Sequence, residues 1–524
     1  MRSRTVGFEH LPKVNPSANK MPLVRQDRPE DTLSQLLNQS RIEELPSDDD
    51  GFEDVDSDED SDQSNGIPFP GKHLRPKRRS KKRLPPWLRQ ASYGLFHDDL
   101  VTTTSEAQDK VTRECLPHLT GEDTQGLELN SYGLPLLRRK QHASFLHAQL
   151  QRLPAPYVAI DSSRPWFFYW SLCGLSTLGE EVSHYRERLI ETLQPLQNST
   201  GGFGGGHGHL SHCACGYAAT LALAIVGGLD MVDRKGMWHW LGTIKQADGG
   251  FCMAVGAEED IRGAYCAMTI ITLLSLPLEL PPNAPARQSG MTSFLDGLGE
   301  WVGRCQTYEG GIGGAPTNEA HGAYAFCALA CLSIIDAPHI SIPKYLDAQA
   351  LVTWLAARQA TPEGGFNGRQ EKLVDACYSH WVGGCWALLQ AALGNEGLQG
   401  KANDIWNREA LVRYLLTCAQ QPGKKGGMRD KPSTRPDAYH TCYSLAGLSH
   451  AENHYHYDDH AATRDSESGR LMVAFNWSAL PASTGDMKGL KVDDNDLVEF
   501  VHPVFVIPMR AVEGARKNFD SAAL

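Results

Sequence analysis

Hydrophobic residues follow two alternating patterns along the middle of the chain, from about residue 160 to residue 450. Some segments are apolar nearly all round, such as YAATLALAIVG (217–227) and YCAMTIITLLSL (265–276). Others carry charge on one face, such as MVDRKGMWHWLGTIKQ (231–246) and NREALVRYLLTCAQQ (407–421). A helix that is apolar on every side is buried, whereas a one-sided helix lies at the surface. The pattern therefore predicts an all-α body with an inner and an outer ring of helices.

These segments belong to an internal repeat of five units. In each unit a helix ends in Gln, a short turn follows, and Gly-Gly precedes an apolar anchor residue. An aromatic residue follows the anchor by 11–14 positions. The Gln and anchor pairs are Gln197 and Phe203, Gln246 and Phe251, Gln306 and Ile312, Gln359 and Phe366, and Gln421 and Met428. Both an open α-solenoid and a closed α/α toroid fit this periodicity.

The repeat should bring polar residues together at one rim, because its Gly-Gly turns place the start of every inner helix on the same side. In units three to five, the ninth and twelfth positions after the anchors are His321 and Tyr324, Asp375 and Tyr378, and Asp437 and His440. We expect these side chains to converge.

Asp375, Cys377 and His440 have the side chains and the spacing of metal ligands. An Asp-x-Cys pair alone is more often an ordinary helix start, but His440 lies in the register of Tyr378 one unit later. Oxygen, sulfur and nitrogen ligands suit Zn²⁺, and three protein ligands leave a fourth position open, as in catalytic zinc sites. A substrate thiol bound there would be held as thiolate.

Cationic and aromatic residues should gather at the same rim. The cations are His321, Arg369 and Lys372, with Arg262 nearer the interior. Together with the Tyr378 hydroxyl they could stabilise charge on a departing diphosphate. The walls below would be aromatic: Trp166, Trp170, Tyr217, Tyr265, Tyr324, Trp381 and Tyr443. Each aromatic alone is more often core, but a ring of them beneath cations suits an allylic chain with a diphosphate head.

Composition and charge narrow the class of protein. Of the 524 residues, 41% are hydrophobic, which is enough for a large core. The chain has thirteen cysteines, and its N-terminal segment lacks the apolar stretch of a signal peptide. We therefore expect reduced thiols and a soluble, cytoplasmic protein. No apolar run reaches the ~20 residues of a membrane helix, so we expect no stable membrane insertion. We also expect no nucleic-acid partner.

The N-terminal region differs from the rest of the chain. An acidic run at 51–62 is followed by a basic run at 72–83, and such blocks of like charge are usually disordered. We therefore predict a disordered tail at 1–85, a catalytic toroid at 86–515 and a short C-terminal tail at 516–524. A nuclear address and a contact with anionic membrane remain alternatives for the basic run.

Over roughly residues 100–515 the chain resembles the β subunits of protein farnesyltransferases, of the protein prenyltransferase β family. The matching blocks are SRPWFFYW (163–170), GGFGGG (201–206), DIRGAYCA (260–267), GGIGGAPTNEAHGAYAFC (310–327), KLVDACYSHW (372–381), DAYHTCYSLAGLS (437–449) and HPVF (502–505). The resemblance implies a closed α/α toroid and a heterodimer with a helical-hairpin α subunit. It also implies transfer of the farnesyl group of farnesyl diphosphate to C-terminal CaaX cysteines, such as those of small GTPases.

The resemblance also implies roles for individual residues, by matching position. One Zn²⁺ would be held by Asp375, Cys377 and His440, and Mg²⁺ would bind near Asp430. The diphosphate residues would be His321, Gly322, Ala323, Tyr324, Arg369, Gln370, Glu371, Lys372 and Tyr378. The residues around the lipid would be Trp166, Tyr217, Arg262, Tyr265, Cys327 and Trp381. The residues near the end of the peptide would be Trp166, Trp170, His212, Tyr439 and Tyr443. The catalytic set would be the zinc ligands with His321, Arg369, Lys372 and Tyr378.

Three departures from the family pattern stand out. Residues 207–215 read HGHLSHCAC where the family has a proline-containing loop, which puts the preference for the last CaaX residue in doubt. A second metal site there, or among the histidines of HAENHYHYDDH (450–460), is the weaker interpretation of these residues. Thr434 stands where relatives often carry lysine.

Three alternatives compete with the farnesyltransferase interpretation. A geranylgeranyltransferase β subunit has the same fold, but bulky Trp166 and Tyr443 favour the fifteen-carbon lipid. A terpene cyclase would need a D-x-D-D proton donor, which the repeat body lacks. A non-catalytic scaffold predicts at least one broken zinc ligand, and all three are present.

Overall fold

The computed structural model describes residues 88, 100–397, 405–465, 469–481, 493 and 496–519. The chain divides into two compact units, of which the smaller comprises residues 1–69 and 158–160. The larger unit comprises residues 70–157 and 161–524 and carries the elements discussed below. The tail predicted at 1–85 lies outside the described residues.

Helices make up most of the described residues. The α-helices are α3 (Thr103–Thr120), α4 (Arg139–Gln149), α5 (Arg164–Thr177), α6 (Arg186–Leu193), α7 (Cys213–Val226), α8 (Arg234–Ile244), α9 (Ile261–Leu273), α10 (Leu298–Arg304), α11 (Gly322–Ile335), α12 (Pro338–Tyr345), α13 (Ala348–Ala356), α14 (Tyr378–Trp381), α15 (Cys385–Gly397), α16 (Arg408–Tyr414), α17 (Ala438–Glu452) and α18 (Met509–Asn518). Shorter 3₁₀ turns are η1 (Ala155–Ser163), η2 (Ser183–Tyr185), η3 (Gln194–Leu196), η4 (Leu229–Met231), η5 (Pro285–Ser289) and η7 (Val473–Phe475), and η6 (Leu415–Ala419) is a π-helix. Strands β1 (Asn453–Tyr457) and β2 (Trp477–Pro481) pair antiparallel.

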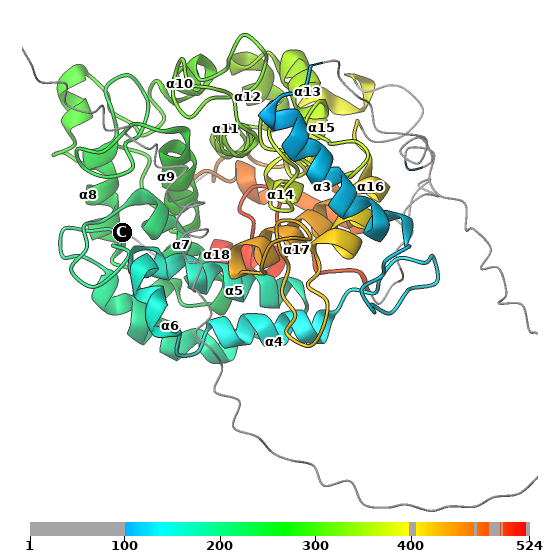
Figure 1. Ribbon diagram of the computed structural model, residues 1–524. Helices are drawn as coiled ribbons and strands as arrows, with labels where there is room; N and C mark the ends of the chain where they lie inside the picture. Colours follow the sequence, from blue (N-terminus) through cyan, green and yellow to red (C-terminus); the bar gives the residue numbers. More distant parts are fainter. Residues whose placement is uncertain are drawn as a thin grey trace, which may run out of the picture. The chain divides into compact units, whose positions relative to one another are not determined.

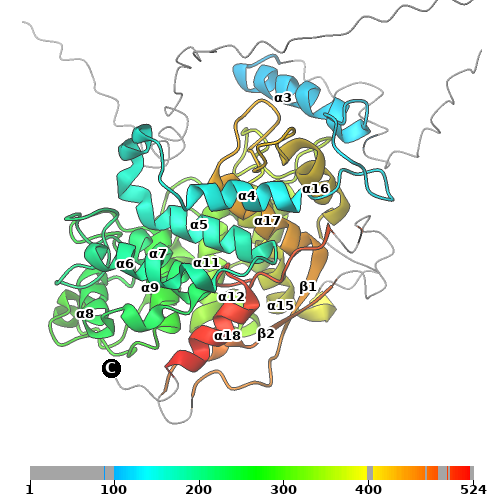
Figure 2. The same ribbon diagram turned by 90° about the horizontal axis from the view of Figure 1, so that it is seen from below.

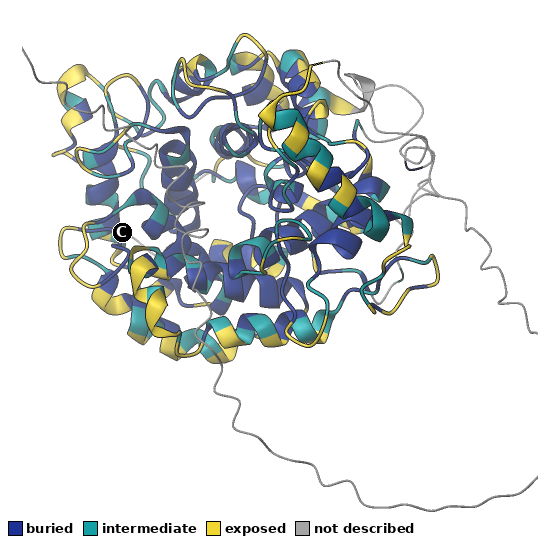
Figure 3. Ribbon diagram, in the orientation of Figure 1, coloured by how far each residue is buried: buried dark blue, intermediate teal, exposed yellow. Residues whose placement is uncertain are grey.

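The predicted inner helices form a closed ring (Figure 1). Neighbouring contacts run from α5 to α7, α9, α11, α15 and α14, and α17, and α17 packs back onto α5. Most residues of these helices are buried, as the predominantly dark blue inner helices of Figure 3 show. The contact between α17 and α5 excludes the open solenoid and confirms the α/α toroid.

In four of the five units a glutamine links two successive outer helices. The Oε1 atoms of Gln197, Gln306, Gln359 and Gln420 accept hydrogen bonds from the backbone N–H groups of Asp233, Asp347, Asn407 and Arg138 at 2.8–3.0 Å. The donors stand at the N-cap positions of the next outer helices, α8, α13 and α16, and Arg138 stands at the N-cap position of α4, where the outer layer begins. The last glutamine therefore closes the outer layer onto its own beginning.

Two units differ in register from the sequence prediction. The residues bridged to the anchors Phe251 and Met428 are Lys245 and Gln420, one position before the predicted glutamines. Lys245 is buried, and its Nζ donates to the Gly249 carbonyl at 2.6 Å. In unit three the Gln306 amide makes the same contact with Gly310 at 3.0 Å. A lysine thus replaces the donor function of the glutamine, and burial lowers its pKa to about 8.

The first glycine of the Gly-Gly turns is required by close packing. In units one and two it is Gly201 and Gly249, whose φ angles of 89° and 110° favour glycine. A Cβ at either position would lie 2.0 Å from a backbone carbonyl oxygen of the next outer segment. No other residue fits, so the turn fixes how each loop enters the inner ring.

The residue nine positions after each anchor caps the start of an inner helix or, in unit four, of the turn before α14. His212, Asp260, His321, Asp375 and Asp437 each accept a hydrogen bond from a backbone N–H two or three residues later. This shared N-cap geometry is why polar side chains collect at one rim, as the repeat predicted.

The C-terminal region covers part of the inner ring. Backbone carbonyls of Val504 and Val506 accept hydrogen bonds from Tyr265 and Tyr169 at 2.7 and 2.9 Å. The β1–β2 pair and α18 are seen together in Figure 2. The all-α prediction did not anticipate this strand pair, because its two five-residue strands, NHYHY and WSALP, give no clear alternation of apolar and polar residues. Within the described residues, no helix is long and apolar enough to cross a membrane.

Candidate active site at one rim of the ring

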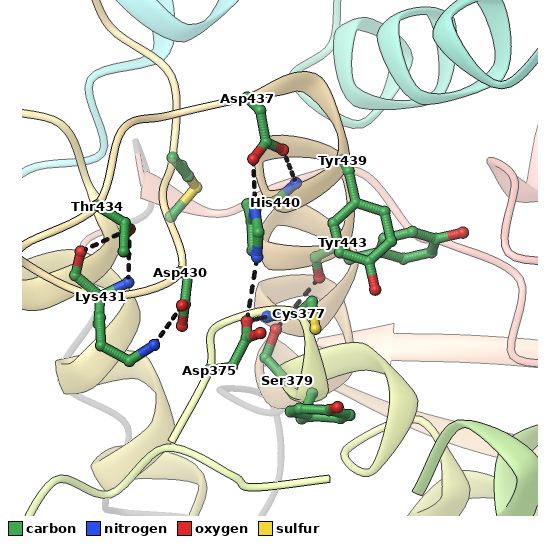
Figure 4. A network of polar contacts seen from close by, with 12 residues as sticks. Asp375, Cys377, Ser379, Asp430, Lys431, Thr434, Asp437, Tyr439, His440 and Tyr443 are labelled. Atoms are coloured by element: carbon green, nitrogen blue, oxygen red, sulfur yellow. Dashed lines mark hydrogen bonds and ion pairs between the residues drawn. The ribbon is translucent and has the colours of Figure 1, made fainter. Parts of the chain in front are cut away.

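Three residues from units four and five form the candidate metal site. Asp375 and Cys377 precede the short helix α14, and His440 is the third residue of α17 (Figure 4). One ligand atom from each lies within 4.8 Å of the other two. The Nε2 atom of His440 is 3.2 Å from Asp375 Oδ1. Residues that are 63 positions apart are thus brought into one cluster, as the repeat register predicted.

Asp437 orients His440 through the ring nitrogen that faces away from Asp375. Its Oδ2 atom lies 2.7 Å from His440 Nδ1, while its Oδ1 atom caps the helix by accepting from the His440 backbone N–H at 2.7 Å. The Nδ1–H therefore points at a carboxylate, and Nε2 faces Asp375 and Cys377. A carboxylate that holds the second nitrogen of a histidine is typical of metal sites, where it fixes the tautomer.

The donor set fits a divalent metal. Cys377 is buried, and burial together with the Asp375 carboxylate raises the pKa of its thiol well above the ordinary value. Burial also opposes ionisation of Asp375, but His440 and Lys431 lower its pKa overall. A carboxylate, a thiol and an imidazole at this spacing are ligands that Zn²⁺ prefers. A cation among them would offset the unfavourable contact between carboxylate and thiolate.

Asp430 lies beside the metal cluster. It is half-buried, and desolvation together with Asp375 raises its pKa to about 6. One carboxylate oxygen pairs with Lys431, and the other, Oδ1, has no hydrogen-bond partner in the described structure. Thr434 holds this loop by accepting from the Lys431 N–H at 3.2 Å and donating to its carbonyl at 2.9 Å. Thr434 thus stabilises the loop at a position where relatives in the family often carry lysine.

His321 and Tyr378 form a hydrogen-bonded pair at the rim. His321 Nδ1 accepts from the Ala323 N–H, so the ring proton lies on Nε2, which is 3.1 Å from the Tyr378 hydroxyl. Burial, Arg369 and Arg262 lower the pKa of His321 to about 4. Partial burial near two arginines therefore favours the neutral imidazole, which can donate from Nε2, and the predicted role of His321 toward a diphosphate stays a prediction.

The rim arginines are already paired with carboxylates. Arg369 Nη1 lies 2.5 Å from Glu319 Oε2. Arg262 donates from Nε and Nη2 to the two oxygens of Asp260, both at 2.8 Å. On the loop that carries Arg369, the side chains of residues 370–372 are exposed. Gly322 donates to the carbonyl of the neighbouring loop residue Gly368 at 2.7 Å, so the two loops are fixed to each other.

Aromatic side chains from successive inner helices form a closed circuit, here called the aromatic ring. Its members, in order of contact, are Trp166, Tyr217, Tyr265, Phe326, Trp381, Tyr443, Tyr439 and Trp170. Successive ring centroids lie 4.7–5.8 Å apart, and Trp170 contacts Trp166 again. Trp166, Trp381 and Tyr439 are only half-buried. Tyr324 lies outside the circuit, with Arg262 over its face at 5.7 Å, and Cys327 is buried on α11.

The histidine-rich segments do not form a second metal cluster within the described residues. His207 and His209 are exposed, His212 caps α7, and Cys213 and Cys215 are buried. In the other segment, His450 is buried with its Nε2 3.1 Å from His380 Nδ1, whereas His456 and His460 are exposed. The weaker interpretation of both segments is therefore not supported.

Sequence reasoning missed two residues of the site and the role of a third. Asp437 was predicted at the rim, but not as the carboxylate that holds His440 Nδ1. Phe326 completes the aromatic ring, and its place two residues after the repeat aromatic Tyr324 gave no signal, because that spacing turns it to another side of the helix. Glu319 carries no sequence signal, because its partner Arg369 is 50 residues away and in the next repeat.

Comparisons with known proteins agree with this architecture. The prenyltransferase alpha-alpha toroid domain family matches residues 137–507. The protein farnesyltransferase subunit beta of Pyricularia oryzae is 49% identical over 434 residues, covering 81% of this chain and 82% of the relative. The protein farnesyltransferase subunit beta of Schizosaccharomyces pombe is 33% identical over 426 residues, covering 81% of this chain and 98% of the relative. A solved structure, Candida albicans protein geranylgeranyltransferase-I complexed with GGPP, aligns with a TM-score of 0.54 and 20% sequence identity. The alignment covers 73% of this chain and 99% of that chain, so the two share the same fold.

Proposed function

We propose, from the premise that this chain belongs to the protein farnesyltransferase β-subunit family, that it transfers a farnesyl group from farnesyl diphosphate to the thiol of a C-terminal CaaX cysteine. The observation that carries the proposal is the convergence of three elements at one rim. An Asp375, Cys377 and His440 cluster lies beside rim arginines and at the edge of a closed aromatic ring. In the reaction the thiol loses its proton to solvent, its sulfur forms a bond to C1, and the bond from C1 to the diphosphate oxygen breaks, so that inorganic diphosphate leaves.

We assign one Zn²⁺ to Asp375, Cys377 and His440. When bound, Zn²⁺ supplies a Lewis acid that lowers the pKa of a thiol at its open position. Asp437 holds the His440 imidazole in the tautomer that leaves Nε2 free. A Mg²⁺ site at Asp430 is supported by its buried, unpartnered Oδ1.

The diphosphate is assigned to the rim of units three and four. His321 donates its Nε2 proton to the Tyr378 hydroxyl, which leaves the hydroxyl proton free to donate to a phosphate oxygen. Arg369 and Lys372 supply positive charge from the neighbouring loop, so that charge developing on the leaving group is stabilised as the C1–O bond breaks. The N-terminus of α11, whose N-cap is His321, adds its partial positive charge.

The aromatic ring is assigned to the lipid and to the end of the peptide. Trp166 contacts both Tyr217 and Trp170, so its bulk closes one part of the ring and favours the fifteen-carbon lipid. Replacing Trp166 with Thr should shift the ratio of kcat/KM toward geranylgeranyl diphosphate by about tenfold or more. An unchanged ratio would mean that chain length is set elsewhere.

An α subunit is the proposed partner, and CaaX-terminated proteins such as small GTPases are the proposed substrates. All thirteen cysteines are free, which supports the cytoplasm as the compartment.

The experiment that tests the function is a turnover assay on the chain co-expressed with a cognate α subunit. A CaaX peptide is offered with farnesyl or geranylgeranyl diphosphate, with and without a zinc chelator. We expect chelator-sensitive transfer of the farnesyl group. Transfer of the longer lipid alone would make the chain a geranylgeranyltransferase subunit, and zinc binding without any transfer would favour the scaffold.

A further inference from the structure

The two arginines at the rim are held by their carboxylates in different ways. Asp260 is buried, caps α9 and receives two hydrogen bonds from Arg262, so this pair is fixed in place. Glu319 contacts Arg369 through one oxygen, and the Glu319 side chain is 53% exposed, against 26% for Arg369. The Arg369 pair can therefore open without moving a helix.

The Arg369 pair also joins the two loops that carry the proposed diphosphate residues. Glu319 lies two residues before His321, on a loop closed by a bridge between Gly313 and Ala320. Arg369 lies on the equivalent loop of the next unit. In each loop a non-glycine residue, Thr317 or Glu371, has a positive φ, of 73° and 59°. Backbone strain of this kind is found where a loop is held in one conformation for function.

We propose that Glu319 is a built-in counter-ion that occupies the Arg369 guanidinium while no diphosphate is bound and thereby lowers the affinity of the rim for diphosphate. This inference rests on the proposed function. A carboxylate and a diphosphate compete for the same guanidinium and repel each other. Glu319 therefore weakens binding of the substrate's head group and, equally, eases release of the inorganic diphosphate product. Glu319 acts on the ligand only through its competition for Arg369.

The test measures dissociation constants of the α-subunit complex for farnesyl diphosphate and for inorganic pyrophosphate. We expect Glu319→Gln to bind both about two- to fivefold more tightly, the range that an exposed ion pair supports. The gain should shrink at high salt, because screening weakens exposed pairs. The matched control is Glu279→Gln, which removes the same charge from a pair with Arg287 (2.7 Å, side chain 74% exposed) outside the rim. This control should leave both constants unchanged.

A second background shows whether Glu319 acts through Arg369. In Arg369→Gln, adding Glu319→Gln should no longer change the dissociation constant of farnesyl diphosphate. A gain that persists there would overturn the proposal, because it would reflect general charge repulsion. Weaker binding in Glu319→Gln alone would overturn it too, since Glu319 would then orient Arg369 for the ligand. Unchanged affinity in Glu319→Gln overturns the inference alone, whereas a wild-type complex that does not bind farnesyl diphosphate overturns the proposed function as well.

Discussion

The loops that follow the anchors in units one and two have the same backbone turn as those in units three and four, but they carry it with different residues. The fifth position after the anchor has a positive φ in all four units, from 59° to 78°. It is Gly208 and Gly256 in the first two units, and Thr317 and Glu371 in the next two. The repeat therefore dictates the backbone, and the side chains are free to differ.

The strained pair of loops is the pair at the candidate active site. Thr317 precedes His321, and Glu371 follows Arg369, whereas the relaxed loops carry neither a metal ligand nor an arginine that faces another loop. A β-branched residue such as Thr317 at positive φ is unfavourable and persists only where the surroundings fix it. Strained backbone therefore lies in the two loops that carry candidate site residues, whereas the other two loops have glycine at the same position.

The largest effect should follow loss of the thiol in unit four. Cys377→Ala removes the sulfur ligand, so we expect less than stoichiometric zinc and transfer reduced by about a hundredfold or more. Cys213→Ala removes a buried thiol at the start of the unit-one helix and should leave both unchanged. Metal analysis and turnover of the α-subunit complexes measure this. Full zinc content in Cys377→Ala would contradict the assigned ligand set.

Asp437→Asn should weaken zinc binding by about ten- to a hundredfold, measured by competition with a chelator. The amide still caps α17, but it no longer gives His440 Nδ1–H a charged acceptor. Asp233→Asn is the control, because Asp233 caps the outer helix α8 in the same way and lies away from the metal. Equal loss in both variants would indicate an effect of the cap on folding.

Exchanging residues at the positive-φ position should change stability in opposite directions. Thr317→Gly should raise the free energy of unfolding by about 1 kcal/mol, because glycine relieves the strain. Gly256→Ala should lower it by about 1 kcal/mol, and no atom lies within 4 Å of the added Cβ, so the cost is in the backbone alone. Denaturation midpoints measure both. A destabilised Thr317→Gly would show that the threonine side chain, and not its backbone, is what the loop needs.

The smallest effect concerns a carboxylate of unit two. Burial and the neighbouring Asp248 raise the pKa of Glu259 to about 7, whereas unfolding returns it to its ordinary, lower value. The folded chain therefore binds the proton more tightly, so stability falls as pH rises from about 5 to 7. Glu259→Gln should flatten this decline in thermal midpoint. Unit three has Ala320 at the same position, so Ala320→Ser should leave the pH dependence as in the wild type.

Much of the fold could be predicted because the information is local. The all-round apolar helices, the Gly-Gly turns and the anchors repeat with a recognisable period, and each unit is built mainly from contacts between neighbours. The ligands Asp375, Cys377 and His440 followed from that register, because residues at equal positions in successive units lie side by side. The sequence could not reveal that Lys245 takes the place of a glutamine, since a buried lysine is uncommon and Gln246 stands next to it.

Other features depend on contacts between segments that are far apart in the sequence. Closure of the ring needs α17 against α5 and Gln420 against Arg138, and periodicity alone allows an open solenoid. The sequence by itself thus determined the helices, the units and the chemical identity of the candidate ligands. Only the tertiary structure decided that the ring closes, that burial near two arginines lowers the pKa of His321, and that Arg369 is held by Glu319. The physical reason is that charge and pairing depend on burial and on distance in space, which no spacing along the chain records.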